Sequence, residues 1–136
     1  MYPEELVMPM KAELTEVGFE ELLTAEAVDN AIKSNETVLV MINSVCGCAA
    51  ANARPAVKMA TKHGKTPDKF TTVFAGFDKE AVDQARKYML PYPPSSPSIA
   101  LFKDGKLVHF IERHHIEGRA AEMIAENLTA AFDEFC

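Results

Sequence analysis

The chain has 136 residues, of which 48% are hydrophobic and 25% are charged, and this balance is typical of one folded domain rather than a disordered chain. Its 14 basic and 20 acidic residues give a net charge of −6 without any basic run, which excludes nucleic-acid binding through a basic face. The longest strongly apolar run, 38–42, is far shorter than the roughly 20 residues that cross a membrane, and the acidic N-terminus differs from a signal peptide.

The first third of the chain predicts two helices, a short strand and a buried strand. Apolar residues recur at helical spacing over 3–17, and a short apolar and acidic segment, 19–23, follows as a candidate strand. Thr24 is a candidate N-cap for a helix over 25–33. The β-branched, continuously apolar run Thr37–Asn43 is typical of a strand that is buried on both faces.

The middle of the chain predicts helix, strand and helix. An alanine-rich helix over 49–63 contains Pro55, which we expect to kink it. A second buried strand over 70–77 and a helix over 79–90 come next. The proline-dense stretch 91–97 is too short to link two domains, so we expect an ordered loop there.

The end of the chain predicts a hairpin and a closing helix. Asp104 and Gly105 stand between two apolar runs, Ser98–Lys103 and Lys106–Ile111, and Asp-Gly in this position is a strong hairpin signal. The last helix is expected over 117–135. Strand-helix alternation followed by a hairpin predicts an α/β fold: a mixed central sheet with helices on both faces and an extra N-terminal helix. We expect one domain over residues 1–136.

Of the three cysteines, two stand one residue apart, and this spacing is the most unusual feature of the chain. An odd, small count argues against a secreted disulfide framework and fits a reducing cytoplasm. Cys46, Gly47 and Cys48 lie where a buried strand meets a helix, and a helix N-terminus favours a thiolate. Because Cys46 comes first and Cys48 lies inside the first turn, we expect Cys46 to be the more exposed nucleophile and Cys48 the resolving thiol.

The spacing of the pair limits its chemistry. A disulfide between residues two apart is tight, and Gly47 permits the bend that it needs. Strained disulfides are the more oxidising ones. We therefore expect Cys46 and Cys48 to form a disulfide only transiently or to oxidise a partner readily, and to reduce stable protein disulfides poorly.

Other interpretations of the cysteines remain open. Both could be small buried hydrophobes, a redox-sensing pair on an interaction surface, or ligands of a thiolate metal site, although the further candidate ligands have no familiar spacing and we predict no metal. Cys136 could be an irrelevant terminal thiol, a resolving thiol for Cys46, or a link between two chains, so monomer and homodimer are both open. The candidate further ligands are His63, His109, His114, His115 and Cys136.

Several residues near the expected site have less specific signals. Ser96 and Pro97 precede a strand, and their peptide bond can be cis, although a plain rigid turn is the commoner case. The run Arg113–His115 could assist proton transfer, but solvated residues that close the hairpin are more typical. Asp78 and Arg54 could tune Cys46, although surface or capping roles are more usual for such residues.

Together these elements resemble the thioredoxin superfamily, with Cys-x-Cys in place of its usual Cys-x-x-Cys. In that superfamily a central strand leads into a cysteine pair at a helix start, and a later proline precedes an antiparallel hairpin. Segments along nearly the whole chain are similar to the bacilliredoxin family in particular. They are 7–10, 43–50, 74–81, 94–98, 113–118 and 127–132.

The resemblance implies a thioredoxin-like fold and a thiol–disulfide oxidoreductase that acts on bacillithiol, a low-molecular-weight thiol of some bacteria. Cys46 would attack the mixed disulfide of a bacillithiol-capped cytoplasmic protein, and Cys48 or a second bacillithiol would release the adduct. Ser96 and Pro97 would form a cis-proline element that presents backbone to an extended substrate. Weak disulfide isomerase or oxidant activity is the alternative. No tightly bound cofactor is implied; bacillithiol is the co-substrate, and capped client proteins are the partners.

Overall fold

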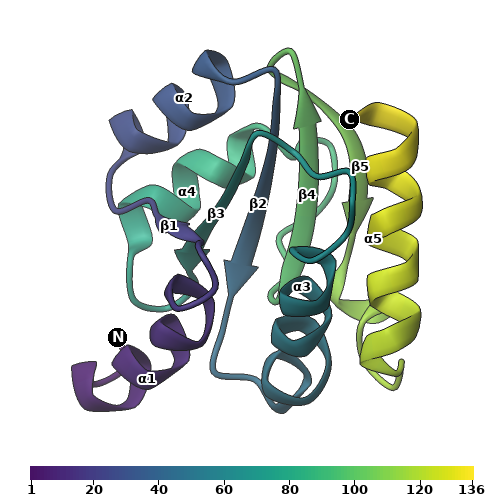
Figure 1. The fold of residues 1–136 in the computed structure, drawn as a ribbon. Helices are drawn as coiled ribbons and strands as arrows, with labels where there is room; N and C mark the ends of the chain where they lie inside the picture. The colour runs from purple at the N-terminus through teal and green to yellow at the C-terminus, as the bar shows by residue number, and fades with distance from the viewer.

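The computed structural model describes residues 1–136 and is organised around a five-stranded sheet with the order β1-β3-β2-β4-β5 (Figure 1). β1, β3 and β2 are parallel to one another, whereas β4 is antiparallel to β2 and to β5. This arrangement confirms the predicted mixed sheet with parallel first strands and a closing hairpin. The strands are β1 (Glu20–Glu21), β2 (Thr37–Asn43), β3 (Lys69–Phe74), β4 (Ser98–Lys103) and β5 (Lys106–Ile111).

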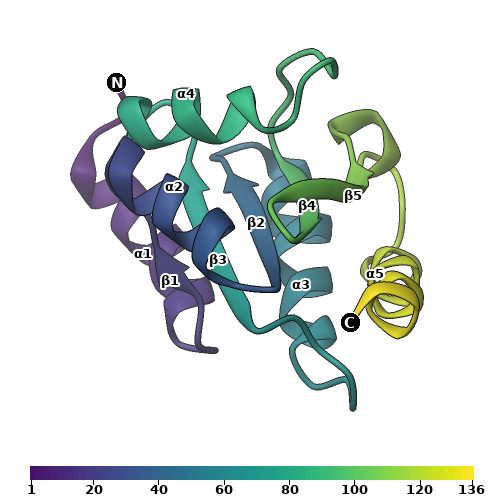
Figure 2. The same ribbon diagram turned by 90° about the horizontal axis from the view of Figure 1, so that it is seen from above.

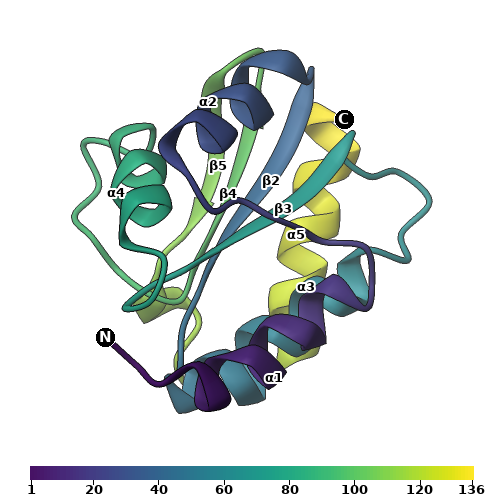
Figure 3. The ribbon, with the colours of Figure 1, turned by 90° about the vertical axis from the view of Figure 1, so that its left-hand side faces the viewer.

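Helices cover both faces of the sheet, as predicted (Figure 2). α2 and α4 pack together on one face, and α3 packs with α5 on the other. The N-terminal α1 lies beside α3 (Figure 3). None of the helices is long and apolar enough to cross a membrane. The helices are α1 (Glu4–Thr15), α2 (Ala25–Ser34), η1 (Ala49–Ala53), α3 (Arg54–Ala60), α4 (Lys79–Lys87), η2 (Arg113–His115) and α5 (Ala121–Phe135).

β2 is the central strand because both of its faces carry apolar side chains. All seven of its residues are buried. Leu39 and Met41 join the core on the α3 and α5 side, whereas Val38, Val40 and Ile42 join the core on the α2 and α4 side. Packing on both faces therefore holds the C-terminal end of β2 in place. The cysteine pair follows this end within a few residues.

Two of the element boundaries that differ from the prediction lie beside a glycine. β3 ends at Phe74 rather than at residue 77. Gly76 has φ +79°, and the amides of Phe77 and Asp78 donate hydrogen bonds to the carbonyl of Phe74, so the chain forms a turn there. α5 begins at Ala121 rather than at residue 117, because Gly118 has φ +70° and ends the preceding turn. Such backbone angles are accessible to glycine and interrupt regular structure.

The helix expected over 49–63 is present as two segments. It starts as the π-helical η1 and continues as α3 from Arg54. The change falls beside Pro55, which has no amide hydrogen to donate to the preceding turn, so the hydrogen-bonding pattern changes there. The predicted irregularity at Pro55 is therefore a change of helix type. α3 ends at Ala60, and α4 likewise ends earlier than expected, at Lys87.

Candidate active site

The cysteine pair lies in the short connection between β2 and η1. The amides of Ala49 and Ala50 donate hydrogen bonds to the carbonyl oxygen of Cys46, at 2.9 and 3.2 Å, so the helical turn starts from Cys46 itself. All cysteines in the chain are free. Cys46 and Cys48 are both half-buried rather than clearly different in exposure, but Cys48 packs against the core.

The sulfur of Cys46 is in an environment that favours the thiolate. Burial alone would raise the pKa of this thiol, but hydrogen bonds from the Cys48 thiol and the Cys48 amide, together with the positive charge of Arg113, hold the pKa below its ordinary value. The Cys48 N–H donates to Cys46 Sγ at 3.4 Å. A thiolate is the form that attacks disulfides, so Cys46 is prepared for thiol–disulfide exchange.

Cys48 has the opposite character. Burial raises the pKa of its thiol to about 11, and the hydrogen bond that it gives to Cys46 and the negative charge of that sulfur act in the same direction. Near neutral pH Cys48 therefore keeps its proton, and its S–H group donates a hydrogen bond to the sulfur of Cys46. The two sulfurs are chemically unequal although they are two residues apart.

Arg113 contacts a proline loop and also acts on the cysteine pair. The Ser96–Pro97 peptide bond is cis, as is the Leu90–Pro91 bond, which no sequence signal had singled out. Arg113 Nη1 donates to the carbonyl of Ser96 at 3.3 Å, its Nε pairs with Glu117, and its charge acts on both Cys46 and Cys48. Arg113 therefore connects the proline loop with the cysteine pair.

The expectation that Arg113 is mainly a solvated residue closing the hairpin is incomplete. Its side chain is exposed, yet it acts at the site. The usable signal was topological: β2 and β5 are both antiparallel to β4, so the residues after β5 leave the sheet at the same end as the residues after β2. The hairpin could be predicted from the sequence, but the place of Arg113 beside the cysteines also depends on β4 pairing with β2.

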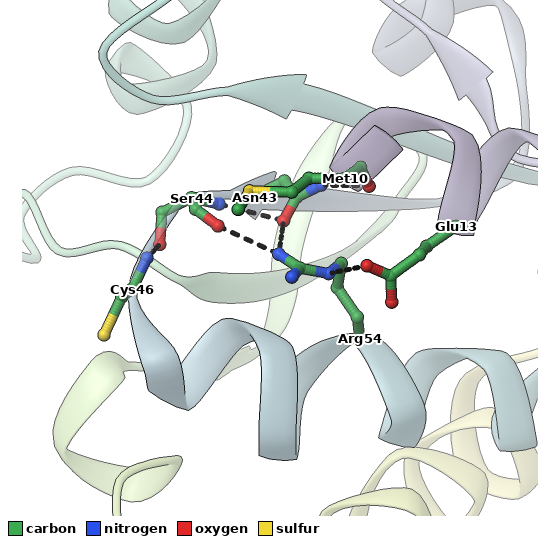
Figure 4. A network of polar contacts seen from close by, with 6 residues as sticks. All are labelled: Met10, Glu13, Asn43, Ser44, Cys46 and Arg54. Atoms are coloured by element: carbon green, nitrogen blue, oxygen red, sulfur yellow. Dashed lines mark hydrogen bonds and ion pairs between the residues drawn. The ribbon is translucent and has the colours of Figure 1, made fainter. Parts of the chain in front are cut away.

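A buried arginine supports the loop that carries Cys46 (Figure 4). Arg54 is 1% exposed, and its Nη1 donates to Asn43 Oδ1 at 3.0 Å and to the Ser44 carbonyl at 2.9 Å. Its Nε lies 3.2 Å from Glu13 Oε2 without the alignment of a hydrogen bond, so this contact is an ion pair. The expected surface or capping role of Arg54 is therefore wrong.

The same network extends from α1 to the cysteine pair (Figure 4). Asn43 Nδ2 donates to the Met10 carbonyl at 3.3 Å, and Asn43 Oδ1 also accepts from the Ser44 amide at 2.9 Å. Ser44 Oγ in turn accepts from the Cys46 amide at 3.2 Å. The buried Asn43 and Ser44 thus hold the backbone that precedes Cys46, and α1 helps to hold Asn43.

The remaining candidates lie elsewhere. Asp78 pairs with Lys11 at 2.7 Å. Cys136 follows the C-terminal end of α5, where burial raises the pKa of its thiol. A helix of this length, 15 residues, spans about 22 Å. Arg119, just before its opposite end, accepts a hydrogen bond from Asn52 in η1, so Cys136 is far from Cys46 of the same chain. No group of three or more His, Cys, Asp or Glu side chains is placed to hold a metal ion.

A strand that leads into a cysteine pair at a helix start, with a cis-proline loop and an antiparallel hairpin, defines a thioredoxin-like oxidoreductase. Solved structures share this fold. A thioredoxin mutant from Halobacterium salinarum is similar with a TM-score of 0.64 at 16% identity, over 88% of this chain and 91% of that one. Oxidised mitochondrial thioredoxin 3 from Saccharomyces cerevisiae has a TM-score of 0.62 at 19% identity, over 90% and 98%.

Sequence relatives identify the family more closely. A bacilliredoxin from Cytophaga hutchinsonii is 63% identical over 98% of this chain and 99% of its own, and one from Halalkalibacterium halodurans is 54% identical over 99% and 94%. The family model described as disulphide isomerase matches residues 2–136. The chain belongs to the bacilliredoxin family, as the sequence resemblance implied, and is a thiol–disulfide oxidoreductase.

Proposed function

We propose that this oxidoreductase removes bacillithiol from capped cysteines of cytoplasmic proteins, with Cys46 as nucleophile and Cys48 as resolving thiol. The observation that carries the assignment is the inequality of the two sulfurs: the environment of Cys46 lowers its pKa, whereas the pKa of Cys48 is raised to about 11. Curated relatives named bacilliredoxin support bacillithiol as the small thiol.

In the first step the Cys46 thiolate attacks the bacillithiol sulfur of the mixed disulfide. A bond forms between Cys46 Sγ and bacillithiol, the disulfide bond breaks, and the client cysteine leaves as a thiolate that takes a proton from water. One disulfide is exchanged for another, so no external electrons are needed. Arg113, close to the cysteine pair, favours the attacking thiolate.

In the second step the adduct on Cys46 is released. Cys48 loses its proton and attacks Cys46 Sγ, which forms the Cys46–Cys48 disulfide and expels bacillithiol as a thiolate. Two further bacillithiol molecules reduce that disulfide and leave as bacillithiol disulfide. Alternatively, a second bacillithiol attacks the adduct directly, with the same net balance. Because burial keeps Cys48 protonated, we expect its attack to be slower than the first step.

Ser96 and Pro97 are proposed to support substrate binding. Backbone next to the cysteine pair can form main-chain hydrogen bonds with an extended client segment. The hydrogen bond from Arg113 Nη1 to the Ser96 carbonyl, 3.3 Å, joins this backbone to the side chain that acts on Cys46. The space beside Gly47 is open, since a side-chain carbon added there would meet no atom within 4 Å, and a substrate can approach the pair from this side.

The assignment is tested with a bacillithiol-capped client and mass spectrometry. Cys46→Ala is expected to abolish release of bacillithiol, whereas Cys48→Ala is expected to accumulate one bacillithiol on Cys46. An adduct at Cys48 or Cys136, or full activity of the Cys46 variant, would contradict the order of the two thiols. Cys136→Ala is the matched control, since it removes a cysteine far from the site, and it is expected to retain activity.

A second candidate activity is disulfide isomerisation, which the description of the family model favours. The same Cys46 thiolate would attack a non-native protein disulfide, and the free client thiol would then displace Cys46 from the mixed disulfide. Recovery of activity from a scrambled, disulfide-bonded test protein measures this reaction. Metal analysis of anaerobically purified protein separates both redox activities from a thiolate metal site, because stoichiometric zinc or iron would contradict them.

A further inference from the structure

A polar hollow lies near the cysteine pair, although neither cysteine lines it. It is a cavity of about 320 Å³ between the last residues of β5, the η2 turn and the first half of α5. This volume is within the range of sites for small molecules, roughly 300–1,000 Å³. The residues that matter for its chemistry are His109, Phe110, His115, Arg119, Met123 and Asn127.

The lining of this cavity is selectively suited to an anion. None of its eight lining residues is acidic, although the chain carries 20 acidic residues and a net charge of −6. Arg119 supplies a permanent cation, and its planar guanidinium matches a carboxylate in geometry. The nearest acidic residues of α5, Glu122 and Glu126, are exposed and lie outside the lining.

Further hydrogen-bond donors in the cavity also favour an anionic ligand. His109 Nε2 lies 2.6 Å from Asn127 Oδ1. The imidazole N–H therefore donates to the amide oxygen, and the amide N–H groups of Asn127 remain available to a ligand. His115 adds a second imidazole. Phe110 and Met123 form apolar wall beside these groups. A small molecule with carboxylates on a short carbon skeleton fits such a combination.

The wall of the cavity is shared with the active site. Along the segment from Arg113 to Arg119, the charges of Arg113 and Glu117 act on the cysteine pair, whereas His115 and Arg119 line the cavity. The carbonyl of Arg119 also accepts a hydrogen bond from Asn52 in η1, the helical segment that follows the cysteines. This segment therefore borders both the cavity and the cysteine pair.

We propose that this cavity binds the carboxylate end of the low-molecular-weight thiol while its sulfur is exchanged at Cys46. The inference rests on the proposed function and adds a specificity site to it. Bacillithiol has the required chemistry, because its malate end carries carboxylates at a distance from the thiol. Arg119 pairs with a carboxylate, Asn127 and His115 donate to it, and the sugar and carbon skeleton lie along Phe110 and Met123.

A selectivity ratio tests the role of Arg119. One client peptide is capped either by bacillithiol or by neutral β-mercaptoethanol, and kcat/KM is compared for the two caps. Arg119→Glu is expected to lower the ratio about tenfold, the loss of roughly one charge-assisted contact at an exposed position. Lys62→Glu makes the same charge change at an exposed site away from the cavity and is expected to keep the ratio of the unaltered protein.

The outcomes separate the cavity from the proposed function. If the unaltered protein removes bacillithiol and Arg119→Glu keeps its ratio, the cavity assignment is overturned and the function stands. If the unaltered protein removes neither cap, the function fails and the cavity assignment fails with it. Binding is measured independently with S-methyl bacillithiol, which cannot form a disulfide. Amide NMR shifts at His115, Arg119 and Asn127 are expected, and shifts confined to the 91–97 loop, or none, would overturn the assignment.

Discussion

Replacing Arg54 tests whether a buried ion network holds the cysteine loop in place. We expect Arg54→Met to lower the free energy of unfolding by about 3 kcal/mol. Methionine keeps an unbranched, apolar stem of similar reach, so the substitution removes the polar contacts without leaving a large cavity. The change is therefore a measure of the guanidinium contacts rather than of lost packing.

The magnitude follows from the contacts of Arg54. Two hydrogen bonds from a charged donor are lost, at 3.0 Å to Asn43 and 2.9 Å to Ser44, and each such bond contributes about 1.5–3 kcal/mol. Part of the sum is recovered, because a methionine avoids the cost of burying a charge and Asn43 Oδ1 keeps its bond from the Ser44 amide. Glu13 is 40% exposed, so its ion pair adds less than about 1 kcal/mol.

Urea unfolding measures the difference. With a slope of about 2 kcal/mol per molar urea, a loss of 3 kcal/mol lowers the midpoint by about 1.5 M. Glu13→Gln is the control and is expected to cost less than about 1 kcal/mol, since it affects only the exposed partner. If Arg54→Met shifts the midpoint no more than Glu13→Gln does, the buried guanidinium does not hold the loop. A single transition is also expected if residues 1–136 form one domain.

Four further changes address the thiols and one helix start. Arg113→Gln is expected to raise the pKa of Cys46, because it removes a positive charge that favours the thiolate; ultraviolet titration of the thiolate measures the pKa, and an unchanged pKa would exclude a role for this charge. Cys46→Ser is expected to bring the pKa of Cys48 below about 11, because the negative sulfur is one cause of its elevation; a value that stays at 11 would leave burial and the charge of Glu117 as its causes. The raised pKa of Cys48 means that the folded state holds its proton more tightly, so its contribution to stability is present below the ordinary value of 9.0 and is lost as pH rises toward 11; Cys48→Ala is expected to flatten this part of the pH dependence of the urea midpoint. Thr24→Ala is expected to cost about 1 kcal/mol in the same assay, because Thr24 Oγ1 accepts from the Ala27 amide at 3.1 Å, and a loss below about 0.3 kcal/mol would contradict this cap.

Local sequence signals were sufficient for most of the fold. The hairpin over β4 and β5 has the predicted bounds because Asp104, with φ 51°, and Gly105, with φ 79°, adopt the turn that an Asp-Gly pair favours. The central strand β2 could be predicted because all of its residues are buried, and a strand buried on both faces is a continuous apolar run in the sequence. Helix starts without a capping signal were harder: no side chain caps α5 at Ala120, and its predicted start was four residues early.

The site divides in the same way between local and long-range information. Cys46 and Cys48 could be found from their position between a strand and a helix. Arg113 and Arg54 could not be assigned, because an arginine in a loop or an early helical turn is usually solvated. Arg54 is buried only because Asn43, Ser44 and Glu13 converge on it from β2 and α1, and no spacing rule in the sequence encodes that convergence.

The dependence of the Cys48 pKa on the charge of Cys46 sets the order of the two proposed steps. While Cys46 is an unreacted thiolate, it raises the pKa of Cys48 by its charge and by accepting a hydrogen bond from the Cys48 thiol, so Cys48 stays protonated and unreactive. In the proposed reaction the bond to bacillithiol removes the negative charge of Cys46, so burial and the charge of Glu117 are the causes that still oppose ionisation of Cys48. Under the proposed mechanism Cys48 becomes more acidic only after capture, and the sulfur proposed to perform the first step also suppresses premature attack by Cys48.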